Sequence, residues 1–97
     1  MGPMKMTLMS VVEDLVSLDE EATIYAAEPW TKDSRALIAR EPTSGGLPEE
    51  AKISGLKYFI EVAIARDFLE GWASNLDHNP SADESCERLI QYAVTDA

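Results

Sequence analysis

The sequence contains one cysteine, Cys86, and one histidine, His78, among its 97 residues. A single cysteine excludes an intramolecular disulfide framework and any metal site that needs several thiolates, and it fits a reducing, cytoplasmic location. The histidine has neither a second histidine nor a Glu-x-x-His motif to complete a zinc or di-iron site. We therefore expect no metal and no cofactor, and we expect His78 to help cap the C-terminus of the preceding helix.

Basic side chains are also scarce, with 8 Lys and Arg against 18 Asp and Glu and a formal net charge of −10. The few bases are interleaved with acids and form no cluster, which argues against direct binding to nucleic acid. No apolar run approaches the roughly 20 residues of a membrane span, so no membrane partner is expected. The first residues lack the apolar stretch of a signal peptide, and we interpret residues 1–6 as a disordered start or an expression-tag remnant.

The sequence has no complete catalytic motif. No serine lies in a nucleophile elbow, and a Ser-His or Cys-His site would have to use His78 in a loop. The Gly45-Gly46 pair is not followed by the lysine of a phosphate-binding loop. Helical projection places Glu61 on an apolar face, where a carboxylate can do acid-base chemistry, but a salt bridge with Lys57 or exposure is the more common outcome. We predict that the protein is not an enzyme.

The chain does have 45% hydrophobic residues, which predicts one folded domain over residues 7–97. The strongest signal within it is the helical spacing of apolar residues. This spacing predicts an amphipathic helix over residues 7–18, a long central helix over 56–76 that is apolar on two faces, and a C-terminal helix. Ser81 and Glu84 have the spacing of a capping box, so Ser81 should begin the last helix.

A different pattern lies between the first two helices. β-Branched and aromatic residues favour strands over 23–27 and 35–40, joined by a hairpin loop over 28–34. Because two strands are marginal alone, they must pack on a helix, gain a third strand or pair with another chain. We expect a small single α+β domain, ordered N-terminal helix, β-hairpin, long central helix and C-terminal helix. A three-helix bundle with an irregular insert is the alternative.

Six carboxylates and no basic side chain lie between Lys5 and Lys32. Such an unbalanced negative field favours a positively charged protein surface as partner, because opposite potentials speed encounter. Some of these acids lie on the solvent side of the first helix, whereas the rest gather at its end and in the hairpin, and acids at a helix C-terminus oppose the helix dipole. That second group indicates a partner, and a merely solubilising surface is the alternative. The six predicted interaction residues are Glu13, Asp14, Asp19, Glu20, Glu21 and Glu28.

Trp30 lies beside Pro29 in the polar hairpin loop. An indole in this position either folds back as a lid on the core, the commoner outcome, or remains exposed as an interface anchor. Its closeness to the acidic stretch makes it the seventh predicted interaction residue.

These observations predict a small acidic protein-binding module that occludes a basic surface on a partner such as a nuclease or a nucleic-acid-binding effector. The alternative is a homo-oligomeric structural or regulatory subunit without catalytic activity, which would pair through the hairpin edge or the central-helix face. In size and acidity alone, the chain resembles immunity proteins, toxin inhibitors and phage anti-defence proteins. The resemblance includes no motif and implies no role for any residue.

Overall fold

The centre of the fold is an antiparallel sheet of three strands, β1 (Thr23–Ala26), β2 (Ala36–Ala39) and β3 (Lys57–Glu61). The computed structural model describes residues 6–95, in which the strand order is β2-β1-β3. The helices of this part of the chain complete an α+β domain, as the sequence predicts. They are α1 (Leu8–Glu13), which continues into the 3-10 turn η1 (Leu15–Ser17), α2 (Glu49–Ser54), α3 (Val62–Ser74) and α4 (Ala82–Thr95).

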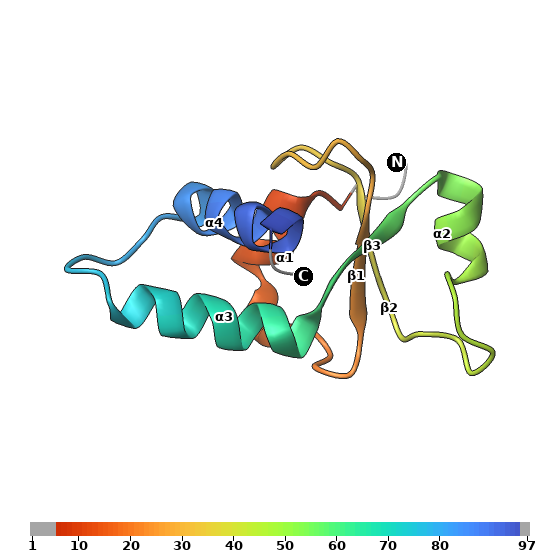
Figure 1. Cartoon of the computed structure of the whole chain (residues 1–97), viewed down its shortest axis with the longest axis horizontal. Coiled ribbons are helices and arrows are strands. Elements are labelled where there is room, and N and C mark those ends of the chain that lie inside the picture. Colours follow the sequence, from red (N-terminus) through yellow and green to blue (C-terminus); the bar gives the residue numbers. More distant parts are fainter. Residues whose placement is uncertain (1–5, 96–97) are drawn as a thin grey trace.

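Helices cover both faces of the sheet, with α1, α3 and α4 on one side and the short α2 on the other (Figure 1). Successive strand residues point to opposite faces. Accordingly, Ile24 of β1 joins the larger core with Ile60 of β3. Its neighbour Tyr25 joins a smaller core with Ala51 of α2 and Leu56. All four residues of β1 are buried, as expected for the middle strand of a covered sheet.

The predicted central helix is wrong over its first part, because residues 57–61 form β3 along the free edge of β1. A β-bulge hides this strand in the sequence. Ile24 pairs with Ile60 and Tyr25 pairs with Tyr58, so Phe59 is an extra residue. Phe59 and Ile60 are therefore both buried in the larger core, and the strict alternation of a strand is lost. The helix starts at Val62, so Phe59 and Ile60, which helical projection places on one of the two apolar faces, belong to the strand.

Side-chain caps begin the first and last helices. Thr7 Oγ1 accepts from the Ser10 N–H at 3.2 Å, while Ser10 Oγ accepts from the Thr7 N–H at 2.9 Å. The predicted box at Ser81 is confirmed, since the Glu84 N–H donates to Ser81 Oγ and the Ser81 N–H to Glu84 Oε1, both at 3.1 Å. The first helix is shorter than predicted, because η1 replaces its last turns.

The predicted disordered start lies outside the described residues except for Met6. The carbonyl oxygen of Met6 accepts from the Ala36 N–H at 2.9 Å, and Thr7 forms an antiparallel bridge with Arg35. The segment before α1 therefore pairs with the start of β2. Among residues 6–95, no helix combines the length and the apolar character needed to cross a membrane.

Candidate functional site

Three of the predicted interaction acids are paired within the chain. Asp19 Oδ2 lies 2.8 Å from Arg40 Nε and Glu21 Oε2 lies 3.1 Å from Arg40 Nη2. Glu20 Oε2 is 3.9 Å from Nη1 of Arg66. The side-chain hydrogen bond from Arg40 and a backbone hydrogen bond from Glu21 hold the pKa of Asp19 below its usual range. The negative field predicted here is therefore offset by two arginines from later in the sequence.

The position of these acids also differs from the prediction. They do not end a helix, because η1 stops at Ser17 and residues 19–21 form the turn that leads into β1. Asp19 Oδ1 accepts from the Glu21 N–H at 3.0 Å, a side-chain bond typical of turns. Their placement is thus explained by turn formation, and no unfavourable helix dipole has to be accounted for.

The remaining three predicted acids stay exposed. Glu13 ends α1, Asp14 follows it, and Glu28 lies in the hairpin loop next to the proline that precedes Trp30. Within residues 6–95, none of the three carboxylates forms an ion pair. These positions keep the uncompensated charge that the sequence predicts for the whole stretch.

Trp30 folds back onto the core. Its ring meets Phe59 edge-on, with ring centroids 4.9 Å apart and an interplanar angle of 87°. Its Nε1–H donates to the carbonyl oxygen of Ala26 at 3.2 Å. The indole is nevertheless only partly buried, so its outer surface remains available to form the wall of a groove.

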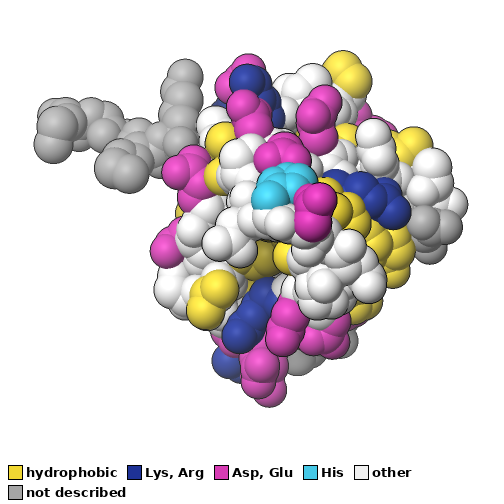
Figure 2. Space-filling view, turned by 90° about the vertical axis from the view of Figure 1, so that its left-hand side faces the viewer, with side chains coloured by type: hydrophobic (Ala, Val, Ile, Leu, Met, Phe, Trp, Pro, Cys, Tyr) yellow, Lys and Arg dark blue, Asp and Glu magenta, His cyan; other side chains and the backbone are white. Residues whose placement is uncertain are grey.

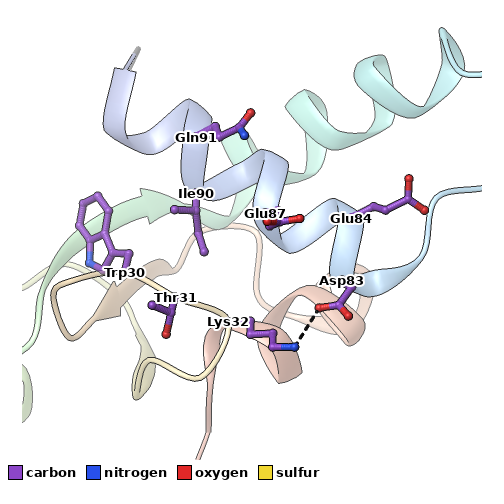
Figure 3. A pocket seen from close by; sticks show the side chains of 8 residues that line it. All are labelled: Trp30, Thr31, Lys32, Asp83, Glu84, Glu87, Ile90 and Gln91. Atoms are coloured by element: carbon purple, nitrogen blue, oxygen red, sulfur yellow. Dashed lines mark ion pairs between the residues drawn. The ribbon is translucent and has the colours of Figure 1, made fainter.

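This groove lies between the hairpin loop and α4 and encloses about 560 Å³ (Figure 3). Figure 3 shows Trp30 at one end, Asp83 at the other, and Ile90 and Glu87 between them on the same side of α4. That alignment follows from helical spacing, because residues three and four apart share a helix face. The groove thus combines an apolar end with an acidic end. Its lining residues are Trp30, Thr31, Lys32, Asp83, Glu84, Glu87, Ile90 and Gln91.

The carboxylates of the groove differ in what they contact. Asp83 Oδ1 lies 3.5 Å from Lys32 Nζ. Glu84 accepts from the Ser81 N–H and lies 3.2 Å from Nε2 of His78. Glu87 is exposed and forms neither an ion pair nor a side-chain hydrogen bond within the described part of the chain. Glu87 is therefore the carboxylate of this groove that is open to a partner.

The buried thiol of Cys86 lies beneath this acidic surface. Burial and the nearby carboxylates of Asp83, Glu87 and Asp33 raise its pKa to about 11, although Lys32 acts in the opposite direction. Cys86 is 1% exposed and belongs to the larger core, where it acts as a small hydrophobic residue. Asp33, from the hairpin loop, is the least of these three carboxylates in its effect on the pKa of Cys86.

His78 has surroundings different from those predicted, whereas Glu61 is exposed, which is one of the two outcomes given above as more common than an acid-base role. His78 does not cap α3 but lies 3.1 Å from Asp77 Oδ1 and 3.2 Å from Glu84 Oε2, beside the first turn of α4. Figure 2 shows this histidine between carboxylates, on a face where acidic side chains are widespread. Glu61 is exposed at the junction of β3 and α3. Across residues 6–95, no three His, Cys, Asp or Glu side chains are grouped so that they could hold a metal ion.

A second groove of about 400 Å³ lies between the first helical segment and α3. Val16, which is 82% exposed, stands at this groove together with Leu69 and Ala73 of α3. Arg66 also lines it, and its guanidinium is directed toward Glu20. This groove contains a single carboxylate, Glu70, and is less acidic than the first.

Sequence reasoning missed the groove between the hairpin loop and α4, because acids in the first turns of a helix are already explained by the favourable helix dipole there. The spacing of Asp83, Glu87 and Ile90 does predict that their side chains share one face of the helix. What the sequence could not supply was the position of the hairpin loop opposite that face. We compared the chain with models of known families, with curated proteins and with solved structures, and none of them matched.

Proposed function

We propose that this protein is a small, non-enzymatic, cytoplasmic binding module that covers a basic surface on another protein, in the manner of an inhibitor, immunity or anti-defence protein. A nuclease or a nucleic-acid-binding effector would present such a surface. The observation that carries the proposal is the groove between the hairpin loop and α4, where a partly exposed indole lies in line with acidic side chains. The free, buried Cys86 fits the reducing location.

Charge and shape have separate roles in this proposal. A net charge of −10 attracts a basic protein over a distance and raises the rate of productive encounter. The partly exposed aromatic surface then supplies short-range affinity, because buried tryptophans are among the strongest anchors in interfaces. Exposed carboxylates around the anchor discriminate against acidic partners, since like charges facing each other cost free energy.

The predicted interaction acids take unequal parts in this surface. Glu28 belongs to the same hairpin loop as Trp30, and its carboxylate is exposed. Glu13 and Asp14 remain available as a further acidic patch on α1. Asp19, Glu20 and Glu21 would have to exchange Arg40 or Arg66 for a partner's base, so their net contribution should be smaller.

The proposal can be tested by affinity capture in the cells that naturally encode the chain. The tagged protein is compared with an Asp83→Asn/Glu87→Gln variant of the groove and with a Glu49→Gln/Glu50→Gln variant in α2. The two variants remove the same charge, but α2 lies on the opposite face of the sheet. We expect a basic protein that both the natural chain and the α2 variant retain, that the groove variant loses, and that salt releases. Retention of the same proteins by the groove variant would overturn the proposal.

A homo-oligomeric subunit is the second candidate function, and the open edge of the sheet favours it. β3 is an outer strand, and its Tyr58 is 48% exposed. An unpaired strand edge can pair with the same edge of another copy. Sedimentation at two salt concentrations separates the candidates, since a stable dimer that does not respond to salt would favour the homo-oligomer.

A further inference from the structure

The groove between the hairpin loop and α4 offers an unusual pair of binding groups. The Nε1–H of Trp30 is already donated to the Ala26 carbonyl, so the indole has no hydrogen bond left to give. Its edge-on contact with Phe59 accounts for another part of the ring. The outer surface of Trp30 can therefore bind a ligand only through apolar contact or through the attraction of its π face for a cation.

The carboxylates of the groove further restrict the kind of ligand that it can bind. Asp83 is paired with Lys32 and Glu84 is held by Ser81 and His78, which leaves Glu87 open. Arg88, the next residue along α4, does not neutralise Glu87, because its guanidinium lies 5.0 Å from the centre of the Phe68 ring. A cation from outside the molecule is thus the natural complement of this carboxylate.

An arginine side chain suits this groove best. A guanidinium is planar, stacks on aromatic faces and donates to carboxylates in a fixed fork, whereas an ammonium is compact and more strongly hydrated. The aliphatic stem of an arginine can also cover apolar surface while its charged end reaches outward. Figure 3 shows Ile90 between Trp30 and Glu87, where such a stem would lie.

We propose that this groove is an arginine-binding site for an exposed segment of the partner, with the guanidinium paired to Glu87, the aliphatic stem on Ile90 and an apolar neighbour of the arginine against Trp30. The inference rests on the proposed function, because it names the feature of the basic partner that the groove reads. According to this inference, the groove recognises a single arginine with an apolar neighbour, and a general excess of positive charge on the partner is not sufficient.

Three short peptides test this site without the natural partner. They have the sequence acetyl-Ala-Leu-X-Leu-Ala-amide, in which X is arginine, lysine or citrulline, the neutral isostere of arginine. Each is titrated into the ¹⁵N-labelled full chain while the indole N–H signals of both tryptophans are followed. Trp72 does not line the groove and serves as the internal control.

We expect the arginine peptide to shift the Trp30 indole signal and leave that of Trp72 in place. Citrulline should weaken binding about tenfold, since it removes the ion pair with Glu87 and the attraction to the other carboxylates of the groove. Lysine should weaken it about threefold. Glu87→Gln should weaken arginine binding about threefold, and Glu50→Gln in α2 should leave it unchanged.

Equal binding of the arginine and citrulline peptides would overturn the inference, as would lysine binding as tight as arginine or an unchanged affinity in Glu87→Gln. Glu87 is exposed, so its substitution leaves the fold intact and the comparison valid. If affinity capture yields a basic partner through the groove while the peptides show no preference for arginine, the proposed function stands and only this inference fails.

Discussion

Arg40 Nε donates to Asp19 Oδ2 at 2.8 Å, although the two residues are 21 positions apart in the sequence. The same guanidinium reaches Glu21 at 3.1 Å, so one arginine at the end of β2 faces two acids of the turn before β1. The antiparallel pairing of these strands creates the contact, because Thr23 lies opposite Ala39. Half of the acids in a segment that is purely acidic in the sequence are thus paired in the fold.

Removing Arg40 should change how stability depends on pH. The folded pKa of Asp19 lies below its unfolded value, so the stabilisation is present above about pH 4 and is lost as the pH falls further. In Arg40→Gln, urea midpoints measured between pH 2 and pH 6 should fall less on acidification than in the natural chain. Arg35→Gln is the control, since Arg35 forms no ion pair within residues 6–95. Identical slopes for both variants would contradict the role of Arg40.

Phe59→Ala should destabilise the protein by about 3–5 kcal/mol, because it removes a buried aromatic ring from the larger core. Tyr58→Ala, in the same strand, should cost about 1 kcal/mol or less, since Tyr58 is 48% exposed. Urea denaturation measures both. A larger loss of stability in Tyr58→Ala than in Phe59→Ala would contradict the burial of Phe59 and the exposure of Tyr58 in β3.

The hairpin, the capping box at Ser81 and the overall class could be predicted because each depends on neighbours in the sequence. Ser81 and Glu84 satisfy each other's backbone groups within one turn of helix. The helical stripe of α4 likewise identifies Cys86 and Leu89 as core residues, and both are 1% exposed.

The third strand could not be predicted, because its bulge places Phe59 and Ile60 on the same core and leaves no alternation to recognise. Its sequence runs directly into α3 at Val62 without a turn residue, so the two elements merge into one apolar segment. The groove could not be predicted from the sequence for a related reason. Trp30 and Glu87 are brought together only when the hairpin loop packs beside α4.

The pKa of His78 should be above its usual value of 6.5, because Asp77 and, to a lesser extent, Glu84 accept hydrogen bonds from the imidazolium. A raised folded pKa means that the stabilisation is present below about pH 6.5 and is lost as the pH rises through the folded pKa. NMR titration of the imidazole protons measures this value. Asp77→Asn should lower it most and Glu84→Gln somewhat less. A midpoint at or below 6.5 in the natural chain would contradict these contacts.

Cys86 should resist thiol reagents while the protein is folded. Burial raises the pKa of this thiol to about 11, so at pH 8 very little of it is the reactive thiolate. Labelling with iodoacetamide should be slow in buffer and fast in denaturant. Fast labelling of the folded chain would show that α4 opens readily, and it would remove the rigid acidic wall on which the groove depends.

The central claim is that the groove between the hairpin loop and α4 attracts a basic protein. The most direct measurement is the association rate constant between the chain and the basic protein that it captures, followed as a function of salt. Glu87→Lys should slow association and flatten its salt dependence more than Glu21→Lys does, because Glu21 is already paired with Arg40. Equal effects of the two substitutions, or no effect of either, would contradict the account.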